Sequence, residues 1–446
     1  MSSINTNNTM LFRKNWTTLY FLFLNSLILS GFLLIFYYKF SYTIISEVLT
    51  LPTIIFSYTM TILAIFVSVI SWTYLSERYM FKYDFFIFYF FIFTLCTILM
   101  VFSINLLQMF VYFEFIFLPS LFFVYQLGYS KKTPRSVTFL LTWTLTGSFL
   151  VLMSLSYLYS SYACVDITYL RCIKFSNLET LFLFLIFFIG FAVKIPAWPF
   201  YYWLTKVHVE APTGFSIFLS GFLVKTAFFC LTFFYFLFYN FYLNLIFLGI
   251  VIWGGYDSSI RMWGSLDIKK LIAFATVQEM NLIIVFLLLS YNSNLMILNI
   301  FLLIHGILSA FFFFLVDQVQ KITNTRNFIV MCGLSLFAPL LGFLVWLGLL
   351  IFRGFPTFVK FFVEWELLHV FYVNFKIVGF FLFFLYAMFA VNGFAKVWLS
   401  VIYGVPNNLF SASEVLKKDF TVGITLSSVL VFLGVIIIFF YGWCFA

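Results

Sequence analysis

Long apolar runs follow one another through almost the whole chain, and they constrain its fold more than any other feature. Each is close to the length of about 20 residues that a helix needs to cross a bilayer. The runs are continuous rather than alternating, which favours helices over the strands of a closed barrel. We therefore expect an all-α polytopic membrane protein. The predicted segments are 17–38, 53–76, 84–103, 106–127, 136–158, 180–198, 211–237, 239–256, 270–290, 294–316, 328–352, 357–373, 376–402 and 421–444.

Charged residues are too few for a water-soluble protein. They make up 9% of the chain and hydrophobic residues make up 64%, whereas a soluble domain carries about 25% charged residues. The net charge of +9 is typical of a membrane protein whose basic residues stay on the inner side. We therefore expect phospholipids, and no nucleic acid, among its partners.

The basic residues are placed asymmetrically along the chain. The loops of one side are rich in Lys and Arg, and the opposite loops are nearly free of them, except at Arg171 and Lys174. This pattern predicts an amino terminus on the matrix or cytoplasmic side. The basic residues assigned to that side are Arg13, Lys14, Arg78, Lys82, Lys131, Lys132, Arg135, Lys206, Arg261, Lys269, Lys270, Lys321, Arg326, Lys417 and Lys418.

The asymmetry requires that segments 328–352 and 357–373 form a single crossing, broken around Gly354. The total is then about 13 transmembrane helices. A second break is predicted at Lys194, because Pro196 lacks a backbone donor and disfavours helix just before it. Paired breaks are typical of inverted repeats around a site near the bilayer midplane.

The breaks suggest two related halves in one membrane domain. The predicted organisation is a polar tail at 1–16, amino-terminal helices at 17–83, the two halves at 84–237 and 238–402, and a loop with a last helix at 403–446.

Several ionisable side chains interrupt the apolar runs. Each costs about 2.5–3.5 kcal/mol at the centre of a bilayer, so such residues are candidates for function. The main candidates are Glu114, Lys194, Lys225, His305 and Glu364, and Lys360 and Glu366 lie beside the last of these.

These residue types suit proton transfer. Loss of water disfavours the charged form of a lysine or a carboxylate, and a nearby opposite charge favours it. A lysine that gains and loses a carboxylate partner therefore takes up and releases a proton. Chains of Glu, Lys and His carry protons through membranes in this way, so we interpret the set as a proton-transfer chain.

Each of these residues also has a structural interpretation. Glu114 and Lys194 would form an ion pair that holds two helices together, and His305 would be a neutral core residue bonded to a backbone carbonyl. Lys360 would extend its ammonium group to the membrane interface, and the two acids that follow it would meet water at the end of a half-helix.

A compact polar stretch separates the two runs that carry Lys194 and Lys225. It contains His208 and Glu210 just before Pro212. Glu210 would either stabilise the positive end of the following helix or take part in proton uptake, and the sequence leaves both open.

The motifs around these residues resemble a known family. The run KIPAWPFYYWLTKVHVEAPTGFSIFLSGFLVK, residues 194–225, resembles the signature of the antiporter-like subunits of respiratory complex I, most of all the subunit 4 family. The resemblance covers roughly residues 85–400. Further similar stretches are FEFIFLP at 113–119, TGS at 146–148, DIKKLIAFATVQEMNLIIV at 267–285, HGILSAFFF at 305–313 and GFPTFVKFFVEWELL at 354–368.

The resemblance implies two antiporter-like inverted halves in the membrane arm of complex I, which pumps protons. It implies that Glu114 modulates Lys194, that Lys225 is the central relay lysine with His305 beside it, and that Glu364 is the carboxylate of the second broken helix. The implied partners are other membrane-arm subunits, including neighbouring antiporter-like subunits. The implied location is the mitochondrial inner membrane, and the bias toward residues with AT-rich codons, without a recognisable import sequence, favours coding inside the organelle.

No cofactor is expected in this chain. NADH, FMN, iron–sulfur clusters and ubiquinone would belong to other subunits, and the sequence has no dinucleotide fingerprint, phosphate-binding loop or metal-ligand spacing. Cys164 and Cys172 share a loop, where two unpaired thiols are favoured over a disulfide.

The chain departs from the family at two positions. The family usually has His where this chain has Tyr201 and Glu279. We therefore treat both, with His208, Glu210 and Lys360, as accessory candidates rather than members of the central chain.

Two other functions fit parts of the sequence. The D-type subunit of a multisubunit cation/proton antiporter shares the motifs and would transport monovalent cations without NADH. A structural scaffold would use the buried charges only to join helices.

Overall fold

The computed structural model describes the part of the chain that holds the candidate residues, and all of it belongs to the larger of two compact units, Ile55–Ala446. The predicted crossings 17–38, 53–76 and 421–444 lie outside the described residues, as does most of 84–103. The described residues are 92–404 apart from 94, 98, 102, 129–131, 290–294 and 357.

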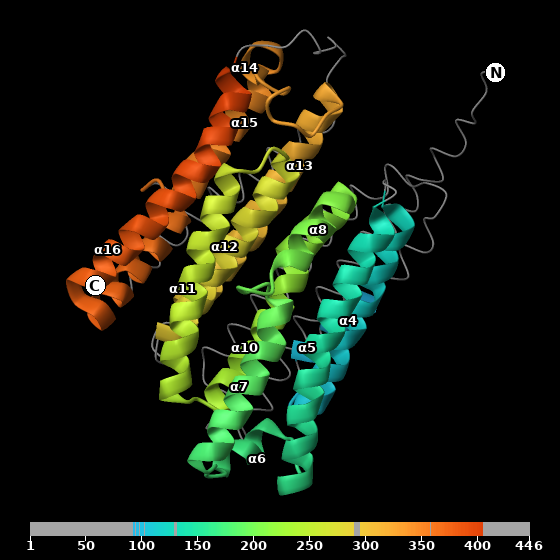
Figure 1. Cartoon of the computed structure of the whole chain (residues 1–446), viewed down its shortest axis with the longest axis vertical. Coiled ribbons are helices and arrows are strands. Elements are labelled where there is room, and N and C mark those ends of the chain that lie inside the picture. The colour runs from blue at the N-terminus through green and yellow to red at the C-terminus, as the bar shows by residue number, and fades with distance from the viewer. Residues whose placement is uncertain are drawn as a thin grey trace, which may run out of the picture. The chain divides into compact units, whose positions relative to one another are not determined.

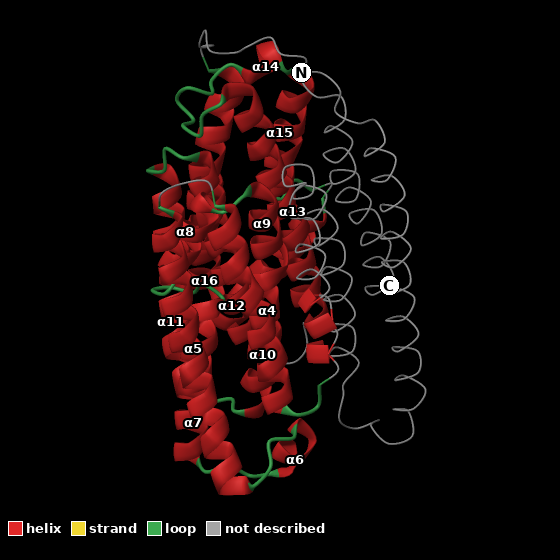
Figure 2. Cartoon of the chain, turned by 90° about the vertical axis from the view of Figure 1, so that its right-hand side faces the viewer, coloured by secondary structure: helices red, strands yellow, loops and turns green. Residues whose placement is uncertain are grey.

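The described part is helical, and its helices run along a common direction (Figures 1 and 2). It contains no β-strand, only isolated bridges. The elements are α4 Leu106–Leu127, α5 Thr133–Tyr162, α6 Ile167–Cys172, α7 Asn177–Lys194, α8 Tyr202–Glu210, α9 Thr213–Phe218, the π-helix η2 Leu219–Leu223, α10 Val224–Leu237, α11 Phe241–Trp263, α12 Ile268–Leu289, α13 Leu295–Thr323, α14 Leu334–Phe337, α15 Pro339–Phe352 and α16 Val359–Tyr403.

Eight helices within the described residues are long and apolar enough to cross a membrane, as the apolar runs predict. They differ in how far they are enclosed. The α12 span is buried throughout, and the continuous span α9–η2–α10 is almost as enclosed. Spans α5 and α16 have most of their residues at the surface. Because α12 and α10 carry Glu279 and Lys225, two candidate charges lie on the most enclosed helices.

Polar side chains cap several helices at their amino-terminal ends. The side chain of Asn105 accepts from the first turn of α4, and Ser176 and Glu179 form a capping box on α7. The hydroxyls of Tyr157 and Tyr162 donate to the same Glu179 carboxylate at 3.1 and 3.0 Å. The caps of Asn105, Ser176 and Glu179 satisfy backbone donors that a helix leaves free at its start, and the two tyrosines hold the Glu179 carboxylate in place.

The two predicted breaks are present. Helix α7 ends at Lys194 and a turn leads into α8, so the polar stretch before Pro212 contains a helix. Helix α15 ends at Phe352 and α16 starts at Val359, with Gly354 at a φ of 65° between them. Glycine adopts this left-handed backbone without the penalty of a Cβ atom.

One boundary differs from the sequence prediction. The run 328–352 becomes a long apolar helix only from Pro339, which occupies the first turn of α15, and this helix is shorter than the eight spans. Proline disfavours helix at the residue before it but fits a first turn, so the chain before it forms turns and the short α14. The runs 357–373 and 376–402 are two helices within α16, as the sequence predicts, and the non-helical residue Lys376 separates them. The chain reverses there, because the rings of Phe371 and Phe383 lie 5.7 Å apart.

Candidate functional site

Lys194 and Glu114 form an ion pair between α7 and α4. Lys194 is completely buried, and 26% of the Glu114 side chain is exposed. The Lys194 ammonium also lies 4.4 Å from the centre of the Phe113 ring, where the ring face favours a cation. The pairing proposed from the sequence is therefore present, and the carboxylate is its more accessible partner.

Lys225 is completely buried at the start of α10, directly after the π-helix η2. Its ammonium group donates to the backbone oxygen of Ser220, within η2. A π-helix has a wider turn and is frequent at functional sites. Among the described residues no carboxylate lies within ion-pair distance of Lys225. Lys225 therefore lacks the direct ion-pair partner that Lys194 has.

Glu279 joins two other candidates in one cluster. Its carboxylate contacts Nδ1 of His305 on α13 and lies 2.6 Å from Nζ of Lys360 on α16. All three side chains are at most 4% exposed. Lys225 is close enough to interact electrostatically with both Glu279 and His305. Glu279, one of the two positions at which the chain departs from the family that it resembles, therefore lies at the centre of the cluster.

Lys360 does not extend to the membrane interface, so that expectation was wrong. Its ammonium donates to the Phe352 carbonyl at 2.8 Å and lies 4.0 Å from the centre of the same ring. The break between α15 and α16 explains the burial, because it turns the first residues of α16 toward α12, where Glu279 supplies the opposite charge.

Glu364 lies one turn beyond Lys360 and is 26% exposed. Its Oε1 is 3.7 Å from the Lys360 ammonium. A Cβ atom added to Gly354 would lie 2.3 Å from the other carboxylate oxygen, so Gly354 makes room for this side chain. Among the described residues no ion pair involves Glu366, which supports the choice of Glu364.

Tyr201 is held by a residue that the sequence analysis did not select. Its hydroxyl donates to Asp257 of α11 at 2.5 Å, and Asp257 also pairs with Arg261 at 3.0 Å. The available signal was the spacing of Asp257 and Arg261, which places opposite charges on one helix face.

His208 and Glu210 lie on α8 but in different surroundings. His208 is completely buried and stacks on Phe313 with ring centres 4.8 Å apart, and neither ring nitrogen has a hydrogen bond within the described part of the chain. Glu210 lines a cavity instead of capping α9, which has no side-chain cap.

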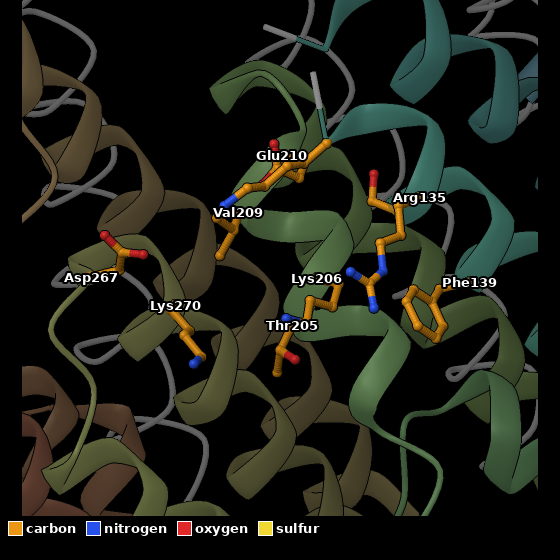
Figure 3. Close-up of a pocket in the computed structure, with 10 residues that line it drawn as sticks. Arg135, Phe139, Thr205, Lys206, Val209, Glu210, Asp267 and Lys270 are labelled. Carbon is orange, nitrogen blue, oxygen red and sulfur yellow. The ribbon is translucent and has the colours of Figure 1, made fainter. Parts of the chain in front are cut away.

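The cavity has a volume of about 310 Å³ and lies between the starts of α5 and α12 and the end of α8 (Figure 3). Its charged lining comes from stretches that the positive-inside rule assigns to the inner side. The lining residues are Lys132, Arg135, Ser136, Phe139, Thr205, Lys206, Val209, Glu210, Asp267 and Lys270.

One cation assigned to the inner side is buried. The side chain of Lys269 is completely buried and donates to the Ala211 carbonyl. It lies in the first turn of α12, and its neighbour Lys270 lines the cavity. No sequence signal distinguishes the two lysines, because their burial depends on which face of α12 meets the bundle.

Within the described residues no group of three His, Cys, Asp or Glu side chains is placed to hold a metal ion. Cys164 and Cys172 form no disulfide in this structure, and whether they form one stays open. That the chain binds no cofactor stays a prediction.

Comparisons with known proteins agree with the geometry. The family described as NADH:quinone oxidoreductase/Mrp antiporter, TM, matches residues 103–390. NADH-ubiquinone oxidoreductase chain 4 of Paramecium tetraurelia is 34% identical over 314 residues, which are 68% of this chain and 64% of that protein. The protein of the same name in Acanthamoeba castellanii is 30% identical over 428 residues, covering 90% of this chain and 80% of its own length.

Two solved structures share the fold. A chain of the archaeal membrane-bound sulfane sulfur reductase has a TM-score of 0.77 at 15% identity and covers 86% of this chain and 80% of its own. A chain of the Mrp complex from Dietzia has a TM-score of 0.72 at 15% identity, with coverages of 84% and 80%. With its motifs, its two broken helices and a match across residues 103–390, the chain belongs to the NADH:quinone oxidoreductase/Mrp antiporter transmembrane family.

Proposed function

We propose that the chain is a proton-translocating membrane-arm subunit of NADH:ubiquinone oxidoreductase, respiratory complex I, of the subunit 4 type. Its family and the names of its relatives support this assignment. The observation that carries it is a series of buried and half-buried ionisable residues across the described helices. The series comprises Glu114, Lys194, Lys225, His305, Glu279, Lys360 and Glu364.

The series offers paired and unpaired states for its lysines. Lys194 has the Glu114 carboxylate as its ion-pair partner, and Lys225 has no carboxylate partner among the described residues. In a medium with little water, loss of a carboxylate partner favours release of the proton from a lysine. A proton that leaves Lys194 can recharge Lys225, and His305 with the acids around it accepts the next transfer. Water that enters between the helices would connect the steps.

Proton uptake would occur on the inner side, at the cavity. The Glu210 carboxylate belongs to the lining, and His208 lies two residues earlier on the same helix. The more exposed Glu364 would connect the other end of the series to release. Tyr201, tied to Asp257, would keep the turn before α8 in position.

The chain would contribute no redox group. NADH, FMN, iron–sulfur clusters and ubiquinone would act in other subunits, and their reactions would drive changes of hydration and pairing here. Its partners would be other membrane-arm subunits, including neighbouring antiporter-like subunits, and phospholipids of the mitochondrial inner membrane. An organelle-encoded origin agrees with the composition of the chain.

The second candidate is the D-type subunit of a multisubunit cation/proton antiporter. The family name includes Mrp antiporters, and the Dietzia structure shares the fold. Isolation of the native assembly separates the two candidates. Flavin and iron–sulfur proteins in the assembly, with NADH-driven acidification of proteoliposomes, are expected. Monovalent-cation transport in an assembly without them would overturn the assignment to complex I.

A Lys225→Ala variant tests the role of the buried charges. We expect the complex to assemble, and NADH-driven pumping to fall by at least about 100-fold, as for the loss of an acid–base group. A scaffold would instead lose activity only in proportion to assembly. Full pumping by the assembled variant would contradict the proposed proton path.

A further inference from the structure

Lys360 lies between two carboxylates that differ in their exposure at the surface of the chain. Its ammonium is 2.6 Å from Glu279 Oε1 and 3.7 Å from Glu364 Oε1. The Glu279 side chain is 4% exposed and that of Glu364 is 26% exposed. The ammonium thus connects a carboxylate inside the bundle with one that reaches its surface.

The ammonium group of Lys360 has three N–H donors, enough to bond to both carboxylates. One hydrogen bond goes to Glu279, and another goes to the Phe352 carbonyl at 2.8 Å. The remaining donor is available to Glu364. Since the two carboxylate distances differ by only about 1 Å, a small rotation of the lysine side chain exchanges its partner.

The surroundings lower the free-energy cost of this exchange of partners. An ionised carboxylate that is buried alone is strongly destabilised. Glu279, however, also contacts Nδ1 of His305, so it keeps a partner when Lys360 turns away. Lys360 belongs to the first turn of α16, directly after the broken segment around Gly354. No continuous helix therefore restrains the backbone on the amino-terminal side of Lys360.

We propose that Lys360 is a further proton-transfer residue, which carries protons between the buried Glu279–His305 pair and Glu364. The inference rests on the proposed function. In the transfer, an Nζ–H bond of Lys360 breaks and an O–H bond forms on Glu364, which leaves a neutral amine and a neutral carboxyl. A proton from protonated His305, relayed by Glu279, then restores the ammonium.

A static ion pair is the competing interpretation, and Lys360→Arg separates the two. Arginine keeps the positive charge and the hydrogen bonds, but it does not release its proton in proteins. We expect the variant complex to assemble, and its NADH-driven pumping to fall by at least about tenfold. Pumping at the unmodified rate would overturn the proposal. Lys396→Arg is the matched control, in the second helix of α16, because Lys396 is exposed and lies over Trp263.

A second variant covers the case in which arginine does not fit. The double substitution Lys360→Met with Glu279→Gln removes both charges and leaves neither partner buried alone. Assembly with at least about tenfold weaker pumping is expected, and unchanged pumping would overturn the proposal. If Lys225→Ala abolishes pumping while both Lys360 variants pump normally, the proposed function stands and this inference fails.

Discussion

Gly147 on α5 faces Gly190 on α7, and this close approach sets the position of Lys194. A Cβ atom added to Gly147 would lie 2.7 Å from the Gly190 backbone oxygen, about 0.7 Å inside ordinary contact, and 3.4 Å from Cε of Lys194. Both glycines are buried inside helices. In Gly147→Ala the backbone oxygen has no freedom to move alone, so the two helices must separate.

The magnitude follows from two opposing effects. Overpacking of this kind costs about 1–3 kcal/mol, while replacement of a helical glycine by alanine stabilises the helix by about 0.5–1 kcal/mol. Gly249→Ala supplies the control, because Gly249 is a helical glycine on α11 with no atom within 4 Å of the added Cβ. Since both variants gain the same helix propensity, their difference isolates the packing cost.

The assay compares variant complexes in the same membrane preparation. We expect Gly147→Ala to lower the temperature of half-inactivation of NADH:ubiquinone turnover and to weaken pumping, since separation of α5 and α7 moves Lys194 relative to Glu114. Gly249→Ala should raise that temperature slightly. If Gly147→Ala matched Gly249→Ala in both measurements, the close helix contact would have no role in placing Lys194.

Two further predictions concern residues where the chain departs from its family. Glu279→Gln should destabilise the complex by about 3–5 kcal/mol, because it leaves Lys360 charged and buried without its main partner. Added Lys360→Met should recover assembly, and thermal inactivation of both variants checks this; equal loss in the two would contradict the ion pair. Tyr201→His should keep most activity, because a ring N–H can donate to Asp257, whereas Tyr201→Phe should weaken it. Equal turnover of these two variants would show that the hydrogen bond to Asp257 has no function.

The membrane fold and the central candidates could be predicted from single residues in their local context. A lysine or glutamate inside an apolar run is conspicuous because hydrocarbon penalises its charge, and this is how Glu114, Lys194 and Lys225 were selected. Pro196 and Gly354 marked the two breaks for a similarly local reason. Proline restricts the backbone conformations available at its own position, and glycine extends them. The domain boundaries between the two halves stay predictions.

The partners of these charges depended on tertiary packing. Glu279 meets His305 across 26 positions of sequence and Lys360 across 81, and no local pattern encodes which faces of α12, α13 and α16 meet. Helix α12 is buried on all sides, so the distribution of apolar residues does not indicate which face carries the cluster. The sequence by itself determined that charges must be buried and where the helices break, because those penalties act at single residues. Only the packed helices decided which charges share a cluster and which stay apart, because pairing requires contact between distant segments.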